Sequence, residues 1–170
     1  SDVTSDVTSE AVSAKREVIS YKDTPNAKPL SNEKALLDYE ACLEFAKGKI
    51  APVLGEKFAE IDSYPTRVRL PDEPLMLCHR VMTMRADHRS LSSGNMVTEH
   101  DVFANAWYLD HGRIPTCIAV EAGQADLFLA AALGIDFETK GQAVYRLLDA
   151  EVCFFGQLPK PGDIIRYNIS

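Results

Sequence analysis

The segment from residue 115 to residue 133 constrains the fold most, because apolar side chains occupy nearly every side of it. Pro115 suits the first turn of a helix, and Gly134 suits its end. The apolar residues between them leave no wide polar face; they are Ile118, Ala119, Val120, Ala122, Ala125, Leu127, Phe128, Leu129 and Leu133. Helices of this kind are usually buried in a core or an interface. We therefore expect one long helix at the centre of the molecule.

Strand-like runs flank this helix on both sides. Residues 75–84 and 96–102 are expected to pair as antiparallel strands around a polar loop, and residues 143–155 and 163–169 follow the helix on either side of a proline- and glycine-containing turn. A curved antiparallel sheet wrapped around a long central helix satisfies this order, and that α+β arrangement is the hot-dog fold. Four strands would leave one edge unpaired, so we expect a domain that is incomplete at its C-terminus.

The chain divides into a linker and one domain. Residues 1–30 contain the direct repeat Ser-Asp-Val-Thr and few large apolar side chains, which is typical of a linker. Residues 31–170 are expected to form the hot-dog domain. It should open with a helix that Ser31 caps, because apolar residues then recur at helical spacing; they are Leu36, Tyr39, Leu43, Ala46 and Ile50.

Composition excludes several classes of function. A net charge of -7 disfavours nucleic acid, which is bound through Lys and Arg. The acidic start lacks the basic and apolar parts of a secretion signal, and no run of about 18 consecutive apolar residues is found, so we expect a cytoplasmic protein without membrane insertion. The four cysteines lie far apart and predict no metal site.

Several motifs together resemble a known family, over about residues 70–169. These are Leu70-Pro71, Leu75-Met76-Leu77, Arg80-Val81, Trp107-Tyr108, IPTCIAVE at 114–121 and Leu133-Gly134. They are similar to the β-hydroxyacyl thioester dehydratases of bacterial fatty acid synthesis. The runs DHGRIPTCIAVEAGQADLFL and VYRLLDAEVCFF are closer still to the first dehydratase-like hot dog of the bacterial multidomain synthases that make polyunsaturated fatty acids.

The resemblance implies a site shared by two paired hot dogs. In the family, a histidine of one half removes the proton next to the thioester, and a carboxylate on the partner's central helix handles the leaving hydroxyl. That carboxylate falls on Glu121, which Gln124 could orient from one turn on. The thioester would lie at the start of the helix, at Pro115, Thr116 and Cys117, where backbone N–H groups polarise its carbonyl.

The position of the histidine is open. An ungapped match places Trp107 there, and Trp107 cannot exchange protons. His111 reaches the same place if the loop is shorter than in the family; the alternative is a solvated loop histidine beside Asp110. Thr116 also stands where the family carries glycine, which puts a close approach of the thioester in doubt.

Two main functions follow from these features. The first is dehydration of a 3-hydroxyacyl chain on an acyl carrier protein, with His111 as base and Glu121 as acid. The second is a non-catalytic hot dog that pairs with a catalytic one, which Trp107 favours. A hot-dog thioesterase is a third, weaker alternative.

The expected partners follow from the same resemblance. They are an acyl carrier protein and a second hot-dog domain, either in cis or as a homodimer. Arginines 67, 69, 85 and 89 form a basic region that could dock an acidic carrier. No cofactor is expected beyond the substrate's own phosphopantetheine arm, because protein groups can supply the proton chemistry.

Overall fold

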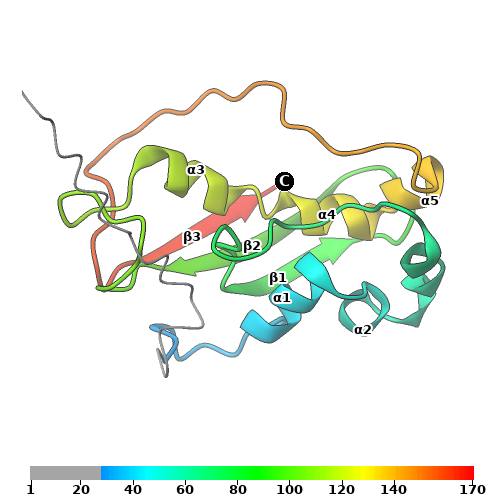
Figure 1. Cartoon of the computed structure of the whole chain (residues 1–170), viewed down its shortest axis with the longest axis horizontal. Helices are drawn as coiled ribbons and strands as arrows, with labels where there is room; N and C mark the ends of the chain where they lie inside the picture. The colour runs from blue at the N-terminus through cyan, green and yellow to red at the C-terminus, as the bar shows by residue number, and fades with distance from the viewer. Residues whose placement is uncertain (1–27) are drawn as a thin grey trace, which may run out of the picture.

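The computed structural model describes residues 28–170 (Figure 1). The linker predicted for residues 1–30 lies almost entirely outside this part of the chain. The described elements are α1 (Tyr39–Lys47), α2 (Ala51–Leu54), the 3₁₀ helix η2 (Glu56–Ser63), β1 (Arg80–Ala86), β2 (Gly94–Asp101), α3 (Thr116–Gly123), α4 (Asp126–Leu133), α5 (Ile135–Thr139) and β3 (Ile164–Ile169).

The strands form one open antiparallel sheet in the order β1-β2-β3. Arg80 on β1 faces Glu99 on β2, and Asp101 at the end of β2 faces Ile164 on β3. The predicted strands at 96–102 and 163–169 are confirmed, as is the loop between β1 and β2. The first strand begins later than predicted, at Arg80: Leu75 closes a turn by donating its N–H to Asp72 O, and residues 76–79 have no regular structure. The molecule is therefore a mixed helix and sheet structure.

The strand predicted at 143–155 is absent from the described chain, and this prediction was wrong. Residues 142–159, here called the strap, run without regular structure from α5 back towards β3 (Figure 1). An extended segment is stabilised as a strand by pairing with a neighbour, and the strap pairs with none of the three described strands, although β3 lies at the edge of the sheet. The strap consequently leaves large apolar side chains exposed, namely Val144, Tyr145, Leu147, Leu148, Val152, Phe154 and Phe155.

The long helix predicted over 115–133 is interrupted. It divides into α3 and α4 around Gln124, where backbone hydrogen bonds span three residues instead of the four of an α-helix. Gln124 N–H donates to the carbonyl of Glu121, and Leu127 N–H donates weakly to that of Gln124. Gly123 precedes the break, and glycine weakens a helix interior. Gly134, in the left-handed conformation with φ of 95°, ends α4 as expected.

The core lies where α4 packs against both α1 and the sheet. Phe128 on α4 stacks on Phe45 of α1, with ring centroids 4.1 Å apart. Gly94 at the start of β2 lets Leu129 approach, because a Cβ there would lie 2.7 Å from Leu129 Cδ1. The face of α4 that carries these residues is buried. The preceding helix, α3, packs over β3 instead, where the Tyr167 hydroxyl donates to the carbonyl of Ala119.

The first helix begins later than the sequence predicted. Asp38, rather than Ser31, caps α1 by accepting a bond from Ala41 N–H at 3.0 Å. The residues before α1 are hydrogen-bonded to the edge of the sheet, because the N–H groups of Leu36 and Leu37 both donate to the carbonyl of Val81. A segment held at a sheet edge in this way cannot also complete a helical turn.

Thr116–Leu133 is long and apolar enough, by length and composition alone, to cross a membrane. Core helices pass the same test, so the observation is weak. Phe128 and Ala131 on this segment are fully buried within the structure.

Candidate active site

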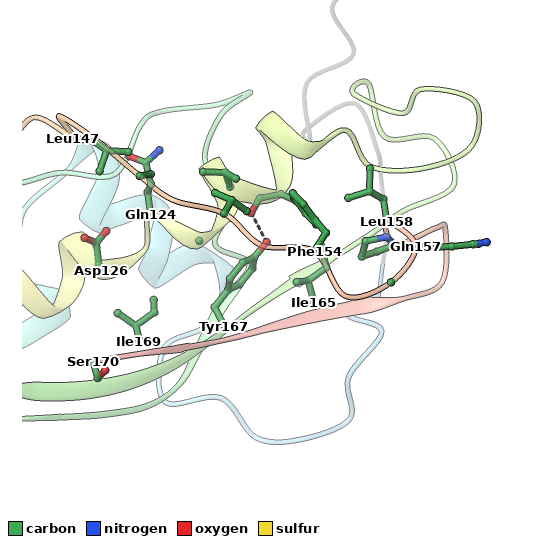
Figure 2. A pocket seen from close by; sticks show the side chains of 17 residues that line it. Gln124, Asp126, Leu147, Phe154, Gln157, Leu158, Ile165, Tyr167, Ile169 and Ser170 are labelled. Atoms are coloured by element: carbon green, nitrogen blue, oxygen red, sulfur yellow. Dashed lines mark hydrogen bonds between the residues drawn. The ribbon is translucent and has the colours of Figure 1, made fainter.

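A largely apolar cavity of about 580 Å³ lies between the helices, β3 and the strap (Figure 2). Small residues of α3 line one wall, and the strap closes one side. Tyr167 lies in its middle and is anchored there, because its hydroxyl donates to Ala119 O at 2.6 Å. The principal apolar residues around it are Val120, Leu147, Val152, Phe154, Ile165 and Ile169. The cavity has the size and lining suited to an alkyl chain.

Gln124 and Asp126 make one end of this cavity polar (Figure 2). Asp126 is half-buried, and burial raises the pKa of its carboxyl group above the ordinary value. The Tyr145 hydroxyl approaches this carboxyl group at the long distance of 3.5 Å. Asp126 was not among the residues singled out from the sequence.

Glu121 lines a second, more polar groove of about 380 Å³. The groove runs between the α3–α4 junction, residues 66–71 and the start of the strap. The Gln124 amide donates to Glu121 Oε2 at 2.8 Å, so these two predicted site residues are in direct contact. Gln124 lines both cavities and therefore lies where they adjoin. Glu121 is half-buried and faces this groove.

His111 lies apart from Glu121. It sits at the tip of a tight turn closed by mutual backbone bonds between Asp110 and Arg113, with a left-handed φ of 47°. Its side chain is 95% exposed, and Asp110 Oδ1 lies 2.7 Å from Nδ1. His111 lines neither cavity. Within one chain, the structure therefore does not bring the predicted base and acid together.

The remaining predicted substrate residues lie where α3 begins. Pro115 is the N-cap in extended conformation, and Thr116 and Cys117 are exposed in the first turn. The first backbone N–H groups of a helix have no carbonyl four residues back to bond to; in α3, Ile118 N–H donates to Pro115 O at 3.1 Å, which leaves those of Thr116 and Cys117 for a ligand. The neighbouring Arg113 ties this region to the strap by donating to Leu158 O and Gln157 Oε1, each at 2.5 Å.

No family model matches the chain, but it is similar to two known proteins. It is 41% identical, over 140 residues, to a polyunsaturated fatty acid synthase subunit of Thraustochytrium sp., and the match covers 82% of this chain. It is 26% identical to the 3-hydroxyacyl-(acyl-carrier-protein) dehydratase FabZ of Nitrobacter hamburgensis, with a match that covers 66% of this chain and 74% of that protein. The chain is thus similar both to a dehydratase of fatty acid synthesis and to a segment of a polyunsaturated fatty acid synthase subunit. It spans only 9% of the length of the Thraustochytrium protein.

The described part of the chain also contains a buried histidine pair, which was not among the residues singled out from the sequence. His79 and His100 stack with ring centroids 4.5 Å apart, on adjoining parts of the sheet. His100 contacts Leu77 O through Nδ1 and the Tyr108 hydroxyl through Nε2, both at 2.7 Å. His79 Nδ1 accepts from Asp101 N–H. Burial lowers the pKa of both imidazoles.

The basic region expected to dock a carrier protein has a structural role at two of its positions. Arg67 is buried and donates to the carbonyls of Phe45 and Gly48, each at 2.9 Å. Arg69 donates to the carbonyls of Ala46 and Gly48. Both guanidinium groups thus bind the carbonyl end of α1, where positive charge is favourable. Arg67 is not available to a partner, which corrects that part of the prediction.

The described residues contain no cluster suited to a metal ion. In residues 28–170, no three His, Cys, Asp or Glu side chains gather into such a group. Cys42 and Cys78 are buried free thiols, and Cys117 and Cys153 are exposed ones. Around the α3–α4 junction, the polar side chains that line the two cavities are Glu121, Gln124 and Asp126.

Proposed function

We propose that this domain removes water from 3-hydroxyacyl thioesters carried on an acyl carrier protein, giving 2-enoyl thioesters. The observation that supports it most is Glu121, held by Gln124 in a groove that adjoins the apolar cavity, in a chain similar to a dehydratase. The acyl chain would occupy the apolar cavity. The thioester would lie towards Glu121 and the start of α3.

The reaction needs one group that donates a proton and one that removes a proton. Glu121 in its acid form would donate a proton to the leaving hydroxyl, so that water departs. A base would take the proton from the carbon next to the thioester, and the electrons of that bond would form the double bond. The first-turn N–H groups of α3 would stabilise the charge that develops on the thioester oxygen. No metal or redox cofactor enters this scheme.

The base would come from a paired domain. Because His111 is exposed at the tip of a turn and lines neither cavity of its own chain, it is suited to reach a neighbour's cavity. We propose that α3 and α4 form the central helix of a hot dog that pairs with a second hot dog, in cis or as a homodimer. The exposed apolar side chains of the strap support such pairing, since large exposed apolar patches mark interaction sites.

The experiment that tests the function is substitution in the parent synthase. Glu121→Gln should reduce formation of the enoyl thioester by about 100- to 10,000-fold, because one proton-transfer group is lost. Glu151→Gln, at an exposed strap position, is the matched control and should leave turnover unchanged. The measurement is mass spectrometry of the carrier-bound product.

The same assay separates the alternatives. His111→Ala should lower turnover comparably, and normal turnover in that variant would remove His111 from the mechanism. Normal turnover in both variants would leave the domain as a non-catalytic pairing half, an alternative to which the tryptophan at position 107 points. Release of free thiol without an enoyl product would identify a thioesterase. Sedimentation of the chain as a stable monomer would contradict homodimer pairing.

A further inference from the structure

One end of the apolar cavity carries a carboxyl group for which the proposed chemistry has no use. Asp126 is the first residue of α4, and Figure 2 shows it at the end of the cavity near Gln124, Leu147 and Ile169. Most other side chains around the cavity are apolar. A polar group placed at one point of an apolar cavity fixes the orientation of a ligand there.

The surroundings of Asp126 leave it able to accept further hydrogen bonds. A carboxylate has about four acceptor sites. The Tyr145 hydroxyl reaches one oxygen at 3.5 Å, a long contact made from the exposed strap. Desolvation by the cavity wall raises the pKa of the group, so a ligand that donates a hydrogen bond would restore part of the hydration that Asp126 has lost.

An ionised carboxylate discriminates between oxygen groups. It accepts a hydrogen bond from a hydroxyl, which is a donor, but it has no proton to offer a keto oxygen, which only accepts. A keto oxygen placed against it finds no donor there and offers none to the carboxylate, and a buried acceptor without a donor is penalised. A carboxylate in the cavity therefore favours a hydroxylated chain over the corresponding keto chain.

We propose that Asp126 is a specificity-determining residue that selects acyl chains bearing a hydroxyl group over the same chains bearing a keto group. This inference rests on the proposed function, because it assumes that the cavity holds the acyl chain.

The test is direct binding to the chain by titration calorimetry at pH 8. The probes are the N-acetylcysteamine thioesters of 3-hydroxydecanoate, 3-oxodecanoate and decanoate. The wild-type chain should bind the hydroxy probe about tenfold more tightly than the keto probe, the difference expected for one hydrogen bond to a charged group. Asp126→Asn should abolish this preference, because an amide can donate to a keto oxygen as well as accept from a hydroxyl.

Two further variants control the measurement. Asp126→Ala should also lose the preference while it still binds decanoate, which guards against a folding defect of the asparagine variant. Asp149→Asn, at an exposed strap position, should keep the preference of the wild type. Circular dichroism of every variant checks that the fold is intact.

The outcomes test the selectivity of Asp126 separately from the proposed binding of the acyl chain in the cavity. If the wild type binds all three probes equally, or Asp126→Asn keeps the tenfold preference, Asp126 does not select and the inference is overturned while the cavity stands. If the wild type binds none of the probes, the cavity does not hold the acyl chain, and the inference falls with that part of the proposed function.

Discussion

The hydroxyl group of Tyr108 lies 2.7 Å from Nε2 of the buried His100. The other ring nitrogen, Nδ1, lies 2.7 Å from the carbonyl of Leu77. Because a carbonyl only accepts, Nδ1 carries the proton and Nε2 accepts from the tyrosine. Tyr108 belongs to the loop that leads to α3, so this contact attaches the approach to the candidate site to the sheet.

Removing the tyrosine hydroxyl should destabilise the fold. Tyr108→Phe leaves the Nε2 acceptor of His100 buried and unpaired, at a cost of about 1–3 kcal/mol. Thermal unfolding should show a Tm lower by a few degrees. Tyr145→Phe, which removes an exposed hydroxyl, is the control and should leave Tm unchanged. Equal Tm values for the two variants would show that the buried contact contributes nothing.

The buried histidine pair should make stability depend on pH. Burial lowers the pKa of His79 and His100, so below about pH 6.5 the unfolded chain binds more protons than the folded one. Stability is then full above that pH and falls as the pH drops, by up to about 1.4 kcal/mol per pH unit for each histidine. Urea unfolding between pH 8 and 5.5 measures this.

Two comparisons identify the groups responsible for that slope. The exposed His111 should not matter, so His111→Gln should reproduce the wild-type slope, whereas His100→Gln should flatten it. Asp126 and Asp136, whose pKa values burial raises, act in the opposite direction at lower pH. A denaturation midpoint that stays constant from pH 8 to 5.5 would argue against a protonation penalty.

Arg80 should be among the costliest residues of the sheet to replace. Its Nε lies 2.7 Å from Glu99 Oε2, and its Nη atoms lie 2.7 and 2.6 Å from the carboxylate of Asp101. All three side chains are buried, so Arg80→Met leaves two carboxylates without this partner, at about 3–5 kcal/mol. Chemical denaturation measures the loss.

The matched variant for Arg80 is Arg166→Met. Arg166 also contacts Glu99, but its side chain is about half exposed, so the loss should be smaller. Arg80→Lys should recover little of the stability, because an ammonium group cannot reproduce bonds to both carboxylates. A larger loss from Arg166→Met than from Arg80→Met would contradict this ranking.

Gly94 is required for the packing of α4 on the sheet. A Cβ at this position would lie 2.7 Å from the Arg85 carbonyl oxygen and from Leu129 Cδ1, so Gly94→Ala should cost about 1–3 kcal/mol. Gly156→Ala is a fitting control, since a Cβ there meets nothing within 4 Å. Thermal unfolding that ranks the two variants equally would show that the sheet and α4 adjust without strain.

The sequence predicted those parts of the fold that depend on local signals. Gly134 marked the end of α4, and the polar loop before Gly94 marked the turn into β2. It did not predict that Leu36 and Leu37 bond to Val81 and so delay α1, because such pairing joins distant residues. The strap has the pattern of a strand, yet it does not pair with the open edge of β3, and a local pattern does not show whether such pairing between distant residues forms.

The candidate site was predictable only in part, for a similar reason. Glu121 and Gln124 lie one turn apart, and the structure places them in contact, as helical spacing alone would do. Asp126 and the His100–Tyr108 contact were missed because each depends on burial between distant segments. The role of Arg67 was misjudged because a sequence does not show which carbonyl groups an arginine will reach.

The break between α3 and α4 gives the two carboxylates separate surroundings. Glu121 lines the polar groove and Asp126 the apolar cavity, although only four residues lie between them. Under the proposed function, a substitution at Asp126 would therefore alter the apolar cavity, while the acidic group on α3 keeps Gln124 as its hydrogen-bonded partner.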